Sequence, residues 1–228
     1  MEYDKLFEKK PAEVRLPMPE NWARAEHFAH FMANPCQVNL TGELEVTALR
    51  AAAKAAGYRF YPLCIWLVSR IVNRHIEFRM TTDEGGAPCH WQEVSPAYVI
   101  FHPDTETFSG LTTPWVDDFD LFYARLLADM ERYRDDPRYQ IPSDCRATFD
   151  LSCLPWMDFT GFTLHLGSSR YLAPIFTWGG FREREGKTWM PMAVDIHHAA
   201  ADGFHIARFF REFEQEAAAL AAELMRRV

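Results

Sequence analysis

The sequence predicts an α/β fold, in the form of an α+β two-layer sandwich with a mixed β-sheet flanked by helices. Helical patterns are interleaved with many short strand patterns along the 228 residues. A chain of this length can bury roughly 70% of the surface that it exposes when unfolded, so it needs no disulfide or metal to fold. No internal repeat or low-complexity linker divides the sequence, and we therefore expect residues 1–228 to form a single domain.

The N-terminal part is expected to be mainly helical. The spacing of apolar residues predicts an amphipathic helix over Asn21–Phe31, and the alternation that follows predicts a half-buried strand over Val38–Val46. An alanine-rich helix over Ala48–Ala56 should come next, with Thr47 as its N-cap. The more apolar pattern over Tyr61–His75 predicts a helix at the centre of the core.

The remainder of the chain is mostly strand-like. Helical patterns return only over Asp117–Tyr133 and, at the C-terminal end, over Gly203–Arg227. Between and around them, short apolar or alternating runs predict strands over Glu77–Thr81, Cys89–Glu93, Ala97–Phe101, Arg146–Cys153, Phe162–Leu166, Pro174–Trp178 and Lys187–His197.

Charge and cysteine content exclude several classes of protein. The net charge is −8 and no basic stripe is present, which argues against a nucleic-acid partner. The first residues lack the pattern of a signal peptide, and the longest apolar segment, Phe60–Val72, is too short to span a bilayer. The five cysteines are odd in number and scattered, without any CxxC pair, which indicates free thiols in a cytoplasmic protein.

The residues that carry chemistry lie in Asp195–Gly203, which reads DIHHAAADG. An apolar strand ends in two histidines, three alanines leave room for a ligand, and Asp202 can cap the following helix. From the residues alone, a His-His pair at a strand end is more often structural than catalytic. A metal site is disfavoured because no third ligand lies near the HxxxD spacing, and we expect no metal. His205 is expected to be a packed or surface histidine.

The string from His198 to Gly203 matches the HxxxDG signature of CoA-dependent acyltransferases, which include chloramphenicol acetyltransferases, dihydrolipoyl acyltransferase cores and acyl-transfer modules of peptide synthesis. The longer string from His197 to Phe209 resembles the type A chloramphenicol acetyltransferases in particular. Further blocks agree with that family in the same order, so the resemblance extends from about residue 20 to residue 220. They are residues 21–28 (NWARAEHF), 58–62 (YRFYP), 72–80 (VNRHIEFRM), 105–109 (TETFS), 130–133 (MERY), 154–156 (LPW) and 173–175 (API).

The resemblance implies a chloramphenicol acetyltransferase-like fold and acetyl transfer from acetyl-CoA to a hydroxyl of chloramphenicol, which gives antibiotic resistance. It implies direct attack in a ternary complex, in a homotrimer whose active sites lie between subunits. His198 would be the general base, since a histidine with a pKa near 6.5 is largely neutral at pH 7. Ser152 would donate a hydrogen bond to the oxyanion. Asp202 would pair with Arg24 and hold the architecture of the site, instead of orienting His198 as in a serine hydrolase.

The resemblance also implies two sets of binding residues. The acceptor would contact Phe31, Cys36, Phe108, Leu164, Ile175 and Thr177. Acetyl-CoA would contact Arg59, Trp156 and Phe181. The acceptor pocket departs from the family pattern at His30, Phe31, Val38, Gly110, Asp150 and Ala201.

These departures leave alternatives open. The same chemistry could serve a different hydroxylated small molecule, with chloramphenicol a poor substrate. A non-catalytic binding protein on the same scaffold is a second alternative, and the joint presence of His198, Ser152, Asp202 and Arg24 argues against it. A dihydrolipoyl acyltransferase core is a third, although such cores normally follow a lipoyl domain and linker.

Overall fold

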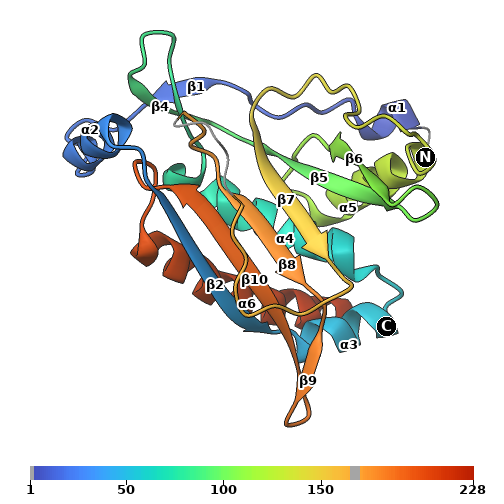
Figure 1. Cartoon of the computed structure of the whole chain (residues 1–228). Helices are drawn as coiled ribbons and strands as arrows, with labels where there is room; N and C mark the ends of the chain where they lie inside the picture. Colours follow the sequence, from blue (N-terminus) through green and yellow to red (C-terminus); the bar gives the residue numbers. More distant parts are fainter. Residues whose placement is uncertain (1–2, 165–169) are drawn as a thin grey trace.

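The computed structural model describes residues 3–164 and 170–228, and a large mixed β-sheet organises them (Figure 1). Within these residues the sheet has seven strands in the order β2-β10-β8-β7-β5-β6, with β9 paired to β10. Strands β5 and β7 are parallel, as are β7 and β8, and the other pairs are antiparallel. The predicted α/β fold with a mixed sheet is therefore confirmed. The strands are β2 (Gln37–Glu45), β5 (Ser95–His102), β6 (Thr107–Thr112), β7 (Thr148–Leu154), β8 (Ile175–Gly179), β9 (Arg182–Arg184) and β10 (Lys187–His197).

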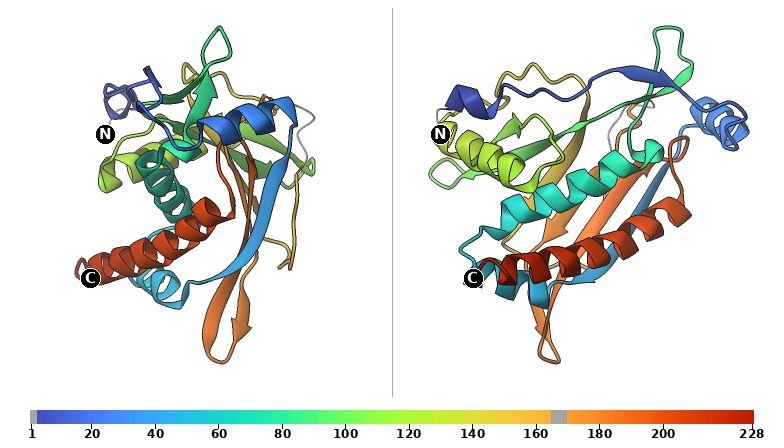
Figure 2. Two further views of the ribbon diagram at one scale, coloured as in Figure 1. Left: turned by 90° about the vertical axis from the view of Figure 1, so that its left-hand side faces the viewer. Right: turned by 180° about the vertical axis from the view of Figure 1, so that it is seen from behind.

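The long helices cover one face of this sheet (Figure 2). They are α3 (Thr47–Ala55), α4 (Phe60–Arg74), α5 (Phe119–Arg132) and α6 (Gly203–Met225). Helix α4 is buried along most of its length, as its apolar pattern predicts. None of the described helices combines the length and the apolar character that a membrane span needs.

Side-chain alternation along β8 separates the core from the opposite face of the sheet. The ring of Phe176 lies 4.6 Å from that of Phe209 on α6, and Trp178 lies 5.5 Å from Tyr61 on α4. Successive residues of a strand point to opposite faces, so Ile175 and Thr177 face away from the helices.

Chain segments without helix or strand cross that opposite face. Asn39 Nδ2 on β2 donates to the carbonyl of Phe162 (2.8 Å), and the amide of Gly180 donates to the carbonyl of Met157 (2.8 Å). The chain after β7 therefore runs over the sheet towards β2, in front of it in Figure 1. The predicted strand over Phe162–Leu166 is wrong for residues 162–164, which form no strand, and residues 165–166 lie outside the described residues.

A small second sheet contains β1 (Arg15–Pro17), β4 (Pro88–Trp91) and β3 (Met80–Thr82), in that order. The strand predicted over Glu77–Thr81 is wrong in its first half, where the chain forms the 3₁₀-helix η1 (Ile76–Phe78). The hydrogen bonds of η1 run from the amides of Phe78 and Arg79 to the carbonyls three residues earlier. The chain therefore turns before β3 begins.

Two helix starts also differ from the prediction. Helix α2 (Ala25–Ala33) begins after Asn21, whose φ of 57° is left-handed and incompatible with the predicted helical start. Helix α3 has Val46 as its N-cap, because the Thr47 hydroxyl accepts instead from the amide of Thr188 on β10.

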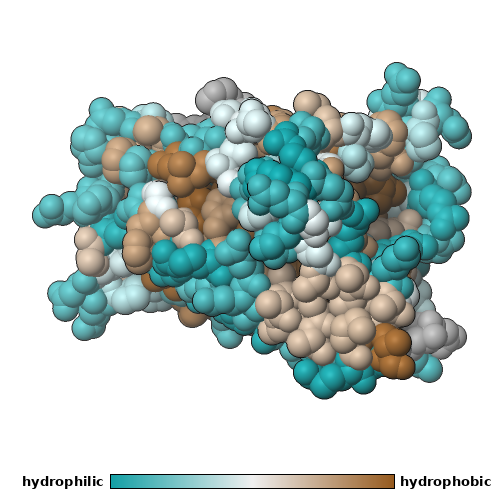
Figure 3. All heavy atoms as spheres, turned by 90° about the horizontal axis from the view of Figure 1, so that it is seen from below, coloured by the Kyte–Doolittle hydropathy of each residue, from teal (hydrophilic) through white to brown (hydrophobic). Residues whose placement is uncertain are grey.

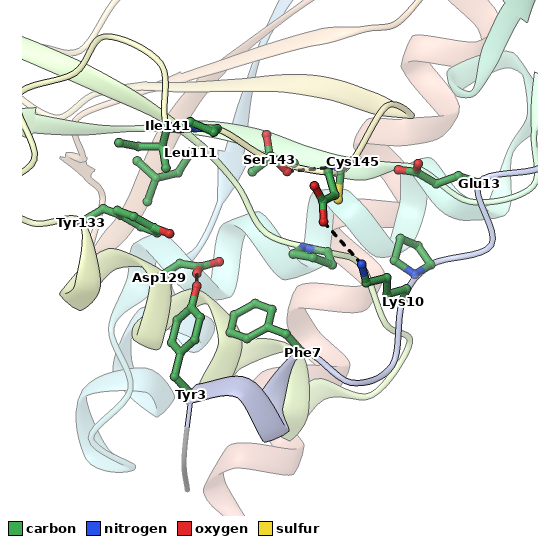
Figure 4. Close-up of a pocket in the computed structure, with 15 residues that line it drawn as sticks. Tyr3, Phe7, Lys10, Glu13, Leu111, Asp129, Tyr133, Ile141, Ser143 and Cys145 are labelled. Atoms are coloured by element: carbon green, nitrogen blue, oxygen red, sulfur yellow. Dashed lines mark hydrogen bonds and ion pairs between the residues drawn. The ribbon is translucent and has the colours of Figure 1, made fainter.

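The N-terminal segment, with α1 (Tyr3–Leu6), packs over α5 and encloses a cavity of about 280 Å³ (Figure 4). Tyr3 donates to Asp129 (2.5 Å) on one side of the cavity, and Lys10 pairs with Asp144 on the other. The fully buried guanidinium of Arg125 donates to the carbonyls of Leu6 (2.6 Å), Lys9 (2.6 Å) and Pro114 (2.8 Å). This arginine anchors the segment to α5.

Candidate active site

His198 directly follows the C-terminal end of β10 and is held there through its backbone. Its amide donates to the carbonyl of Cys36 (2.8 Å), and its carbonyl accepts from Arg24 Nη2 (3.0 Å). Its imidazole stacks on the ring of Phe31 from α2, with the ring centroids 3.8 Å apart and an angle of 9° between the planes. The imidazole is thus positioned by packing and by two main-chain contacts.

The ring nitrogens of His198 are not held by a carboxylate within the described residues. Its Nδ1 is buried and has no hydrogen-bond partner there. The neighbouring His197 is different, because its Nδ1 accepts from the amide of Ala199 (3.1 Å) and closes the turn. Burial, together with the adjacent His198, lowers the pKa of His197.

Asp202 is directed away from His198 and towards Arg24. Its Oδ2 lies 2.5 Å from Arg24 Nη1, and its Oδ1 accepts from the amide of Phe204 (3.0 Å) as the N-cap of α6. Burial alone would raise the pKa of Asp202, but the charges of His205 and Arg24 outweigh it and hold that pKa below its usual value. One arginine therefore ties the start of α6 to the carbonyl of His198.

His205 belongs to the same network, which sequence reasoning did not find. Its Nδ1 lies 2.8 Å from Asp202 Oδ1, and its Nε2 lies 3.5 Å from Glu77 Oε1. Glu77 also pairs with Arg208 (3.0 Å). Despite the cost of burial, the hydrogen bond from His205 and the charge of Arg208 lower the pKa of Glu77 to about 2. The HxxxDGxH spacing, which places one histidine on each side of an N-cap aspartate, was the one available signal.

Ser152 lies on β7, on the sheet face that points away from the helices. It is in register with Thr177 on β8, which is in register with Ala193 on β10. The Thr177 hydroxyl is buried and has no hydrogen-bond partner among the described residues. Ser152 also lines a cavity of about 430 Å³, together with Phe108 and Trp156.

The structure does not bring Ser152 and His198 together within one chain. Strands β7 and β10 run in opposite directions (Figure 1). Ser152 is near the end of β7 and His198 follows the end of β10, so the two residues lie near opposite ends of the sheet. His198 is five residues beyond the level of Ser152 and two strands across, which corresponds to about 20 Å.

The predicted binding residues divide between these two ends. Phe31 and Cys36 contact His198, whereas Ile175 and Thr177 belong to the same patch as Ser152. Phe108 lines the cavity beside Ser152. Leu164, on the segment that crosses the sheet, is 42% exposed.

The three predicted CoA contacts follow or precede elements at the Ser152 end. Arg59 precedes α4, and its amide donates to the Tyr123 hydroxyl (2.7 Å). Trp156 and Phe181 are 63% and 40% exposed, and the guanidinium of Arg50 lies 4.5 Å from the Phe181 ring centroid.

Figure 3 shows that hydrophobic and hydrophilic residues both reach the surface seen from below. In the described ranges, no three His, Cys, Asp or Glu side chains gather as they would around a metal ion.

The family model described as chloramphenicol acetyltransferase matches residues 17–214. The chain belongs to the chloramphenicol acetyltransferase family. The chloramphenicol acetyltransferase of Streptomyces acrimycini is 41% identical over 212 residues, which cover 89% of this chain and 95% of that protein. A chloramphenicol acetyltransferase of Clostridium perfringens is 38% identical over 202 residues, which cover 86% of this chain and 91% of that protein.

Solved structures agree with this family assignment. A chloramphenicol acetyltransferase structure superposes with a TM-score of 0.80 at 26% identity, covering 89% of this chain and 99% of that one. The dihydrolipoamide acetyltransferase of Azotobacter vinelandii shares the fold, with a TM-score of 0.63 at 19% identity, and covers 95% of this chain and 96% of that one. The resemblance found in the sequence is confirmed.

Proposed function

We propose that this protein transfers an acetyl group from acetyl-CoA to a hydroxyl of chloramphenicol and so confers resistance to that antibiotic. One observation carries the proposal. A histidine whose backbone is fixed by Arg24 and Cys36, and whose ring is fixed by Phe31, directly follows β10 in a chain of the chloramphenicol acetyltransferase family.

His198 acts as the general base. An unprotonated ring nitrogen takes the proton of the acceptor hydroxyl as the oxygen attacks the thioester carbonyl, which contributes about 10²–10⁴-fold to the rate. The oxygen–carbon bond forms, the carbonyl π electrons move onto oxygen, and the intermediate collapses with release of the CoA thiolate. The imidazolium then returns its proton to the thiolate. Stacking on Phe31 supports this role because it keeps the ring in one orientation.

Ser152 stabilises the oxyanion of that intermediate by donating a hydrogen bond. Because Ser152 lies about 20 Å from His198 in one chain, the complete site joins His198 of one subunit to Ser152 of another. We propose that the assembly is a homotrimer with its active sites between subunits. Asp202 and Arg24 support the site structurally, since their ion pair connects α6 to the backbone of His198.

The two substrates approach this site from different sides. Arg59, Trp156 and Phe181 contact acetyl-CoA, and the exposure of the two rings supports that role. The acceptor contacts Phe31 and Cys36 beside His198, and Phe108, Leu164, Ile175 and Thr177 from the subunit that supplies Ser152.

One continuous cluster of buried apolar residues supports a single domain over residues 1–228, and five free thiols support a cytoplasmic location.

Release of the CoA thiol from acetyl-CoA in the presence of chloramphenicol tests the proposal. The wild-type protein should release thiol rapidly, His198→Ala should lose at least about 10²-fold in kcat, and the exposed His27→Ala should behave as wild type. Equal rates for wild type and His198→Ala would contradict the role of the base, and the absence of thiol release from wild type would contradict the reaction.

A further inference from the structure

A carboxyl group lies beside Ser152 on the sheet face that points away from the helices. Asp150 precedes Ser152 by two residues on β7 and is in register with Ile175 on β8. Because alternate residues of neighbouring strands share a face, Asp150, Ser152, Ile175 and Thr177 form one patch. The patch therefore places a carboxyl group next to the proposed oxyanion donor and two proposed acceptor contacts.

Among the described residues, Tyr171 is the side chain that holds Asp150 in place. The Tyr171 hydroxyl donates to its Oδ2, and no Lys or Arg among the described residues forms an ion pair with it. Burial raises the pKa of Asp150, and the hydrogen bond from Tyr171 partly offsets this effect. A carboxylate offers about four lone-pair sites, so one phenol leaves most of its capacity to accept hydrogen bonds unused.

The surroundings of Asp150 favour a ligand that donates hydrogen bonds. Asp195 on β10 is in register with Ile175 from the other side and is 2% exposed, so two carboxyl groups flank that isoleucine. Thr177, which is 1% exposed, has a hydroxyl without a partner in the part of the chain that the structure describes. A buried polar group without a partner costs free energy, which a bound donor would recover.

We propose that Asp150 determines acceptor specificity by binding a nitrogen-bound hydrogen beside the hydroxyl to be acetylated, with preference for a protonated amine. Tyr171 is the positioning residue that orients the carboxylate. The inference rests on the proposed function and deepens it, because it names the chemical class of acceptor that this chain favours. Its physical basis is that a hydrogen bond between an ammonium and a carboxylate is about twice as strong as a neutral one.

Two acceptors with the same carbon skeleton test the proposal. Chloramphenicol carries an amide nitrogen, and its deacylated form, 2-amino-1-(4-nitrophenyl)propane-1,3-diol, carries an amine that is protonated at pH 7. Asp150→Asn should lower kcat/KM for the amine by about tenfold or more and change kcat/KM for chloramphenicol by less than about threefold. Tyr171→Phe should shift the same ratio in the same direction by less, and Asp104→Asn in the exposed turn after β5 should leave it unchanged. Tandem mass spectrometry locates the acetyl group on oxygen.

The results separate this inference from the proposed function. If Asp150→Asn lowers kcat/KM equally for both acceptors, or leaves their ratio unchanged, Asp150 is only structural and the inference is wrong. If wild type acetylates neither acceptor, the proposed function is wrong, and calorimetry still tests Asp150 through binding. An unchanged Kd for the amine in Asp150→Asn would overturn the inference, whereas a Kd about tenfold weaker would support it.

Discussion

The ring of Phe31 lies parallel to the imidazole of His198, with the two centroids 3.8 Å apart. No hydrogen bond from a described residue fixes the Nδ1 of this imidazole, so stacking is the main side-chain contact that sets the ring plane. A half-buried phenylalanine therefore has a positional role that its hydrophobicity alone does not reveal.

Replacement of this ring should reduce catalysis more than stability. We expect Phe31→Leu to lower kcat by about tenfold, because the imidazole gains freedom to rotate away from the attacking hydroxyl. The melting temperature should change by only a few degrees, since Phe31 is partly exposed. Steady-state kinetics beside thermal unfolding checks this expectation, and an unchanged kcat would show that the stacking does not position the base.

Loss of the Asp202 carboxylate should damage the structure more than proton transfer. Asp202→Asn leaves the charge of Arg24, whose side chain is 12% exposed, without its partner. Because Asp202 itself is 31% exposed, we expect a loss of about 2 kcal/mol in the free energy of unfolding, less than the roughly 3–5 kcal/mol for breaking a fully buried pair.

Urea unfolding measures that loss, and Asp144→Asn in the exposed pair with Lys10 is the matched control, with an expected change near zero. The residual kcat of Asp202→Asn should exceed that of His198→Ala. If the two variants lost activity equally while Asp202→Asn kept its full stability, Asp202 would have a direct part in proton transfer.

Acid should weaken the network around α6. The pKa of Glu77 in the folded protein is about 2, against an ordinary value of 4.5, so the unfolded chain binds the proton first as the pH falls. The contribution of Glu77 is fully present above about pH 4.5 and is lost progressively towards pH 2, with a total of about 3 kcal/mol. The lowered pKa of Asp202 acts in the same direction.

Unfolding free energies measured at several pH values across this window test the expectation. Glu77→Gln should be less stable than wild type at pH 6, and its stability should fall less between pH 4.5 and pH 2. Parallel curves for the two proteins would show that Glu77 is not the group that titrates.

Two inactive variants should restore activity when they are assembled together. His198→Ala retains Ser152, and Ser152→Ala retains His198, so a mixed assembly can contain sites with both residues intact. Co-expression and purification of mixed assemblies should therefore recover a fraction of the wild-type thiol release, which neither variant shows alone. Mixed assemblies of His198→Ala and His198→Asn provide the control, and equal inactivity of both mixtures would contradict a site shared between subunits.

The sequence predicted the elements whose pattern is local and strong. Strand β10 over Lys187–His197 and the capped start of α6 at Asp202 both agree with the structure, because a long apolar run and an N-cap are read from adjacent residues. Strand β6 was missed because its six residues, TFSGLT, are mostly polar or small and gain their conformation from pairing with β5.

In the candidate site too, features encoded in adjacent residues were predicted and features that depend on distant contacts were not. The HxxxDG string identified His198 and its surroundings, since the chemistry is encoded in six consecutive residues. The contact between His205 and Glu77 joins α6 to η1 across 128 positions of sequence and could not be read from spacing. The separation of Ser152 from His198 depends on strand direction and register, which local patterns do not specify.

The anchoring of the N-terminal segment by Arg125 has a consequence for how that end of the molecule meets water. Three peptide carbonyls surround the guanidinium and take the place of its hydration shell. Removal of the segment would expose a cation that water solvates readily, alongside whatever apolar surface the segment covers. Two of these carbonyls, those of Leu6 and Lys9, belong to the N-terminal segment, which therefore replaces water as a hydrogen-bond partner of a buried charge.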